Sequence, residues 1–130
     1  MITNVEEIKH ALTSKENTLF ITNRRAGKTT ALLELIHEEC NSYILTLDNC
    51  SKKLMIERYK EMFDDYGYQK IFAQNEAYKL NMENVYIDEY FFHDKLYTEF
   101  KGAVGSLRFP IEIKRFKVDN SQSYSEFLES

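Results

Sequence analysis

The sequence predicts an α/β fold with a mostly parallel central sheet. Runs rich in β-branched and aromatic residues, typical of buried strands, alternate along the chain with segments of helical periodicity. Such alternation indicates parallel strands that are covered by helices on both faces, which gives three layers. The 130 residues, 43% of them apolar, have the size and composition of one domain. We therefore expect residues 1–130 to form a single domain.

The first half of the chain is expected to hold three helices and two strands. In chain order these are a helix over 5–14, a strand over 18–22, a helix over 31–39, a strand over 43–47 and a helix between 51 and 67. Asn4 and Ser51 can cap the first and third helices, because their side-chain oxygens accept hydrogen bonds from free backbone N–H groups. Gly67 supplies a stop for the third helix.

The second half of the chain has a weaker pattern. The elements expected there are, in order, a short edge strand over 70–72, a turn of helix before residue 80, and core strands over 84–89 and 109–118. Gly102 and Gly105 indicate a loop between the two core strands. The polar tail over 119–130 is expected to be mobile.

Charge limits the partners of the chain. The 17 basic and 21 acidic side chains give a net charge of −4, so a nucleic-acid partner would require a local basic patch. A patch of this kind, or simply a solvated face, is expected on the third helix and near the C-terminus. The residues concerned are Lys52, Lys53, Arg58 and Lys60, and then Lys114, Arg115 and Lys117.

Cysteine usage and hydropathy predict a cytoplasmic protein. Cys40 and Cys50 lack metal-ligand spacing, and we expect them to be buried thiols in a reducing compartment. No targeting leader opens the chain, and no apolar run approaches the ~20 residues that span a bilayer, so no membrane partner is expected.

The strongest functional signal lies between the first predicted strand and the second helix. The segment Thr22-Asn23-Arg24-Arg25-Ala26-Gly27-Lys28-Thr29-Thr30 completes the second half of the phosphate-loop pattern G-x-x-x-x-G-K-[ST]. Thr22 stands where that pattern has its first glycine. An ordinary strand–turn–helix junction is the alternative, but the strand before and the helix after favour a phosphate site.

Each residue type in this segment has a chemical reason. Gly27 lets successive backbone N–H groups turn toward phosphate oxygens at a helix N-terminus. The Lys28 ammonium can contact the β- and γ-phosphates, the Thr29 hydroxyl can complete a Mg²⁺ shell, and Thr30 can donate to the α-phosphate. The predicted nucleotide-binding residues are Asn23, Arg24, Arg25, Ala26, Gly27, Lys28, Thr29 and Thr30.

Two acids follow a later apolar strand, as a phosphate loop requires. In Val85-Tyr86-Ile87-Asp88-Glu89, Asp88 is expected at the carboxyl end of a strand beside the loop, where it could hold Mg²⁺. Glu89 could orient or deprotonate the attacking water. The alternative is an exposed pair of acids without a function.

Arginines are the remaining catalytic candidates. Arg24 or Arg25 could act as a cation against the γ-phosphate; balancing Asp88 or facing solvent are alternatives that the sequence leaves open. Arg108 and Arg115 could act in trans if the protein formed a ring, or could make surface ion pairs.

Together, segments 22–30 and 85–89 resemble the additional-strand, catalytic-glutamate branch of P-loop NTPases, and within it the ATPase domain of viral terminase large subunits. The resemblance covers about residues 18–90. It implies a three-layer P-loop NTPase fold and a Mg²⁺-dependent ATPase, with Lys28 and Glu89 catalytic and Thr29 and Asp88 on the metal. This chain has no room for the nuclease domain of terminases.

The same resemblance implies a biological setting and one further strand. The setting would be nucleic-acid handling such as DNA packaging, in a homo-oligomer or a larger viral assembly in the host cytoplasm. The further strand would lie between the two motif strands and end in a polar residue; 109–118 fits it, with Asn120 or Ser121 as that residue.

Two other functions remain open. Gly27-Lys28-Thr29 with Asp88-Glu89-Tyr90-Phe91-Phe92 is also similar to type II thymidine kinases, in which the glutamate would be the base toward a nucleoside. Cys40 and Cys50 do not supply the zinc-bound lasso of those enzymes. A nucleotide-binding switch with weak turnover is the third possibility.

Overall fold

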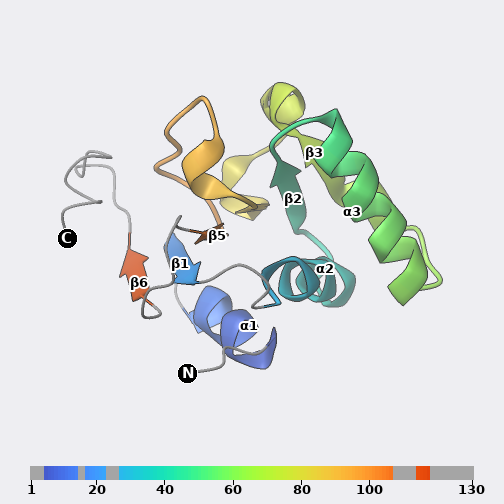
Figure 1. The fold of residues 1–130 in the computed structure, drawn as a ribbon, viewed down its shortest axis with the longest axis horizontal. Coiled ribbons are helices and arrows are strands. Elements are labelled where there is room, and N and C mark those ends of the chain that lie inside the picture. Colours follow the sequence, from blue (N-terminus) through green and yellow to red (C-terminus); the bar gives the residue numbers. More distant parts are fainter. Residues whose placement is uncertain (1–4, 15–16, 23–26, 107–113, 118–130) are drawn as a thin grey trace.

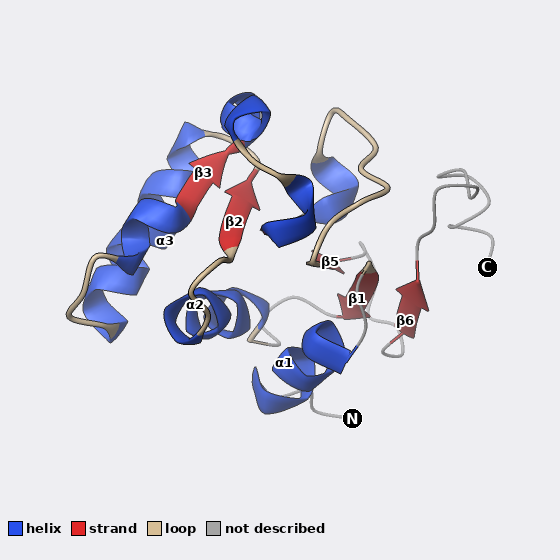
Figure 2. Cartoon of the chain, turned by 180° about the vertical axis from the view of Figure 1, so that it is seen from behind, coloured by secondary structure: helices blue, strands red, loops and turns tan. Residues whose placement is uncertain are grey.

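The fold is α/β with a mostly parallel central sheet, which confirms the predicted class. The computed structural model describes residues 5–14, 17–22, 27–106 and 114–117. The strands are β1 (Thr18–Thr22), β2 (Tyr43–Thr46), β3 (Ile71–Ala73), β4 (Val85–Ile87), β5 (Gly102–Ser106) and β6 (Lys114–Lys117). They form one six-stranded sheet in the order β3-β2-β4-β5-β1-β6. Only β6, at the edge beside β1 (Figure 2), runs antiparallel to its neighbour among these strands.

Three α-helices pack against one face of the sheet. They are α1 (Val5–Ser14), α2 (Lys28–Glu38) and α3 (Asn49–Met62). Their apolar faces bury Phe20, Ile44, Tyr86 and Val104, which alternate along their strands with residues that face the other way. This shared core fixes the helices against the sheet through the burial of apolar surface.

The opposite face is covered without α-helices. Its cover consists of the 3₁₀ turns η2 (Gln74–Lys79), η3 (Met82–Asn84) and η4 (Tyr90–Phe92) and the loop that leads into β5; a further turn, η1 (Gly67–Lys70), precedes β3. Leu19, Leu45 and Ile87 are buried there against Tyr90 and Phe100. Figure 1 shows this loop, in orange, on the opposite side of the sheet from α1 and α2. Both faces are therefore covered as predicted, but one of them by short turns.

Most elements predicted before residue 80 are confirmed. The strands β1 and β2, helix α1 and edge strand β3 lie within one or two residues of their predicted positions, and η2 is the predicted turn of helix. Helix α2 begins at Lys28 rather than Ala31. The prediction that Gly67 stops the third helix was wrong, because α3 ends at Met62 and Gly67 begins the turn η1. The cap of α3 is Asp48 and not Ser51, because the Asp48 carboxylate accepts a hydrogen bond from the Ser51 N–H at 2.7 Å.

Two predictions for the last part of the chain were wrong. Gly102 and Gly105 lie in strand β5, between the two motif strands, and not in a loop. Small residues are needed there: a Cβ on Gly105 would lie 2.9 Å from the Phe91 ring, and one on Gly102 would lie 3.1 Å from the Tyr86 ring. Of the predicted strand over 109–118 the structure describes 114–117, and these form the edge strand β6 and not the intervening strand.

The prediction for the two cysteines was wrong, and two other predictions concern residues that the structure does not describe. Cys40 and Cys50 are exposed free thiols, so the prediction that they are buried was wrong; both lie on segments outside the apolar cores. The Asn4 cap and the tail over 119–130 lie outside the described residues.

The two helical leucines Leu33 and Leu54 provide a matched test of the core. Leu33 of α2 is fully buried, whereas Leu54 of α3 is 62% exposed. We expect Leu33→Ala to lower the free energy of unfolding by about 2–5 kcal/mol, because it removes buried methyl groups and leaves a cavity. Leu54→Ala should change it by about 0.5 kcal/mol or less. Urea denaturation measures both, and equal losses would contradict the assigned core.

Candidate functional site

Gly27 and the first turn of α2 have features of an anion site. Gly27 adopts the left-handed conformation (φ +89°) directly before the first residue of α2, and its carbonyl accepts the Ala31 N–H at 2.9 Å. A Cβ on Gly27 would lie 3.0 Å from Val5, so both backbone and packing favour glycine. The first N–H groups of α2 thus face outward at the positive end of the helix.

Lys28 is held at this helix end in an unusually buried position. It is only 7% exposed, although it is the first residue of the helix. A lysine with so little exposed surface has most of its side chain withdrawn from bulk water.

Asp88 and Glu89 follow β4 at the same edge of the sheet. The Asp88 N–H donates to Leu45 O at 3.0 Å, which continues the pairing of β4 with β2 by one residue. Asp88 is 8% exposed, whereas Glu89 is half-buried and adopts a left-handed conformation (φ +51°). The backbone therefore turns between them, so that the two carboxylates occupy different positions.

The charge of Lys28 acts on the buried carboxyl of Asp88. Burial and, after it, the negative charge of Glu89 raise the pKa of Asp88 to about 7, against the opposite effects of a hydrogen bond with the Glu89 backbone and of the Lys28 charge. Lys28 is therefore close enough to stabilise the ionised carboxylate.

His93 holds the backbone of Asp88. Its Nε2 lies 2.7 Å from Asp88 O, and because a carbonyl oxygen only accepts, Nε2 carries the hydrogen. Burial lowers the pKa of His93, which keeps the ring neutral. The contact fixes the turn from which Glu89 projects.

A cleft of about 610 Å³ opens above these residues. Its walls come from the start of α2, the end of β2, helix α3, the turn after β4 and the end of β5. The lining residues are Gly27, Lys28, Thr29, Thr30, Leu47, Arg58, Glu89, Phe92 and Ser106. Four predicted nucleotide-binding residues and the predicted base Glu89 thus share one cavity.

Besides Leu47, three residues of this cleft were not predicted as part of the site. Arg58 reaches from α3 and donates from Nη2 to Thr30 Oγ1 at 2.7 Å. Phe92 is 58% exposed at the cleft. Ser106 ends β5 opposite Thr22, which is the place expected for a polar residue on the intervening strand. The polar end of the small-residue run 102–106 is a signal that could have identified Ser106, whereas no local pattern marks Arg58.

Several predicted residues cannot be placed. Asn23, Arg24, Arg25 and Ala26 lie outside the described residues, as do Arg108, Asn120 and Ser121. Arg115 belongs to the edge strand β6 by its backbone.

Within the described part of the chain, no group of three or more His, Cys, Asp or Glu side chains is arranged to hold a metal ion. Mg²⁺ beside phosphates needs fewer protein ligands, because phosphate oxygens and water complete its shell. The Thr29 hydroxyl and the Asp88 carboxylate are hard oxygen donors of the kind required; Thr29 lines the cleft, whereas Asp88 is buried and is not among the lining residues.

Comparison of the chain with protein-family models, with curated proteins and with solved structures finds no match. None of the helices in the described ranges is long and apolar enough to cross a membrane.

Replacing Asp88 should alter how stability depends on pH. Its pKa is about 7 in the folded chain against an ordinary value of 3.8, so between these values the folded state keeps a proton that the unfolded state releases. Wild-type stability should therefore fall as the pH rises from about 4 to 7, by up to about 4 kcal/mol from this group. Asp88→Asn should remove that part of the fall and should be more stable than wild type at pH 8.

Urea denaturation at pH 5 and pH 8 measures the difference. Asp64→Asn is the matched control, because Asp64 is exposed and does not line the cleft. An Asp88→Asn profile parallel to that of wild type would contradict the burial of an ionisable carboxyl at this position.

Proposed function

We propose that the chain is a P-loop NTPase that binds Mg²⁺-ATP in the 610 Å³ cleft and hydrolyses it. One observation supports this most: the charge of the buried Lys28 at a helix N-terminus acts on the buried acid Asp88, and a second acid, Glu89, lines the same cleft as Lys28. A helix N-terminus with a lysine favours phosphate, and the acids favour a cation that accompanies it.

In this proposal each side chain has one role. The N–H groups at the start of α2 and the Lys28 ammonium hold the β- and γ-phosphates, while Thr29 and Asp88 hold Mg²⁺. When bound, Mg²⁺ would neutralise phosphate charge. Glu89 orients a water molecule and accepts its proton as the water oxygen bonds to the γ-phosphorus and the bond to the β-phosphate oxygen breaks.

Arg58 and Phe92 extend the proposed site. The Arg58 guanidinium already lies 2.7 Å from Thr30 Oγ1, so a small movement would bring it to phosphate oxygens. Among the residues that the structure describes, Arg58 is the arginine that lines the cleft. The exposed ring of Phe92 offers a stacking surface to the base.

Coupling to nucleic acid is part of the proposal through the terminase resemblance alone. The basic residues of α3 give it no separate support, because Lys52 is paired with Glu76 at 2.7 Å and Arg58 turns to the cleft. A DNA-packaging role, a viral setting and an oligomeric ring stand on the same resemblance. A hydrolysis assay with and without single- and double-stranded DNA tests the coupling.

Lys28→Ala and Glu89→Gln should separate binding from chemistry. Lys28→Ala removes a buried charge partner of the phosphates, so we expect it to abolish Mg²⁺-ATP binding in calorimetry. Glu89→Gln keeps the size of the side chain but cannot accept a proton, so binding should persist while hydrolysis falls by about 100-fold or more. Undiminished turnover in Glu89→Gln would contradict its role, and ATP binding without turnover in wild type would favour the switch.

Arg58→Ala should weaken ATP binding by about tenfold, the size expected for one charge-assisted hydrogen bond. Lys53→Ala is the control, because Lys53 is exposed on the same helix and does not line the cleft. Equal affinities of the two variants would show that Arg58 only buttresses Thr30.

A further inference from the structure

A second cleft, of about 670 Å³, lies beside the candidate phosphate site, and Leu47 lines both. It is formed by the segment after β2, the turns η2 and η3, and the loop after η4. Its position at the carboxyl ends of parallel strands is where ligands bind in open α/β sheets.

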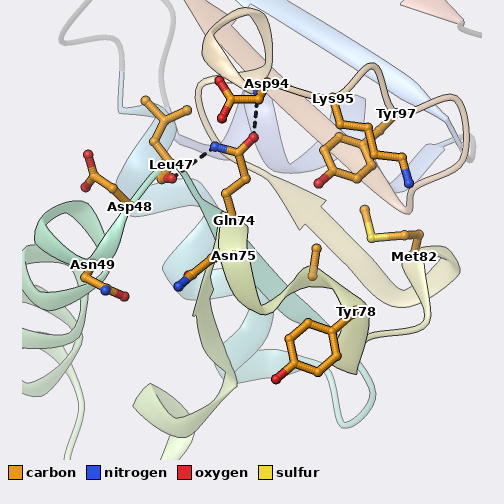
Figure 3. Close-up of a pocket in the computed structure, with 11 residues that line it drawn as sticks. Leu47, Asp48, Asn49, Gln74, Asn75, Tyr78, Met82, Asp94, Lys95 and Tyr97 are labelled. Carbon is orange, nitrogen blue, oxygen red and sulfur yellow. Dashed lines mark hydrogen bonds between the residues drawn. The ribbon is translucent and has the colours of Figure 1, made fainter.

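The floor of this cleft is built by Gln74 (Figure 3). Its Nε2 donates to Leu47 O at 3.2 Å, and its Oε1 accepts the Asp94 N–H at 2.6 Å. One side chain thus joins the end of β2 to the loop before β5. The two hydrogen bonds use both ends of the amide, so the cleft has a fixed base rather than a chance gap between loops.

The two sides of the cleft differ in character. Figure 3 shows Tyr97, Met82 and Tyr78 on one side and Asp48 and Asn49 on the other. Tyr78 is 82% exposed, so the face of its ring is accessible to a ligand. A ligand that fits both sides has a flat apolar face and an edge or a set of hydroxyl groups that form hydrogen bonds.

The charge of the cleft argues against phosphate. Asp48 and Asp94 outnumber Lys95 among the lining residues. The neighbouring cations Lys52 and Lys79 are engaged by Glu76, at 2.7 and 3.4 Å. A nucleic-acid backbone or a nucleotide would therefore be repelled, whereas an uncharged ligand would not.

We propose that this cleft binds a free nucleoside, with its base on Tyr78 and its hydroxyl groups or base edge toward Asp48 and Asn49. The inference deepens the proposed function by naming a second ligand next to the ATP site. Its biological role depends on the proposed function, but nucleoside binding itself can be measured without ATP or Mg²⁺.

The test is calorimetry of the full chain with adenosine, guanosine, cytidine and thymidine, each without nucleotide or metal. We expect one of them to bind, and its 5′-monophosphate to bind at least tenfold more weakly because of the acidic lining. Tyr78→Ala should weaken nucleoside binding by about tenfold through loss of stacking. Tyr66→Ala is the control, because Tyr66 is 75% exposed outside the cleft.

The outcomes separate this inference from the proposed ATP site. Lys28→Ala should lose ATP and keep the nucleoside; if wild type binds ATP but no nucleoside at millimolar concentration, only the second-ligand proposal fails. Tighter binding of the monophosphate, equal binding of free ribose, or unchanged affinity in Tyr78→Ala would each overturn it as well.

Discussion

The burial of Asp88 next to Lys28 is the constraint on which the site depends. A carboxyl with 8% exposure is destabilised when ionised, and the charge of Lys28 offsets part of that cost. The two residues come from segments that are distant in the sequence. They lie at the same edge of the sheet with only one strand, β5, between β4 and β1. Without the left-handed turn at Gly27, α2 would not begin where Lys28 can reach this position.

The intervening strand sets the spacing of the site. The strand β5 reads Gly-Ala-Val-Gly-Ser, and its glycines let the Tyr86 and Phe91 rings lie directly on the sheet. Larger side chains there would push the turn after β4 outward, and Glu89 with it. The two apolar cores hold this arrangement from both faces, one through α-helices and the other through short turns and a loop.

Much of the fold could be predicted from local sequence, and the failures have physical causes. Strands such as Thr18–Thr22 are dense in β-branched and aromatic residues, so their type and position were clear. The strand β5 was missed because its glycines satisfy tertiary contacts with aromatic rings, which no local pattern reveals. At the site, the spacing of the two motifs was enough to identify Gly27, Lys28, Asp88 and Glu89. Arg58 joins them only through helix packing, and the gathering of Tyr78, Tyr97 and Asp48 in one cleft likewise depends on the folded chain.

Amide NMR of the ¹⁵N-labelled chain during addition of Mg²⁺-ATP tests the central claim most directly, because it reports both whether and where the nucleotide binds. The account predicts that the Gly27, Lys28 and Thr29 resonances shift most, together with those of Asp88 and Glu89, and that they return when Mg²⁺ and nucleotide are removed. Shifts confined to other surfaces, or none at millimolar nucleotide, would contradict a phosphate site at the start of α2.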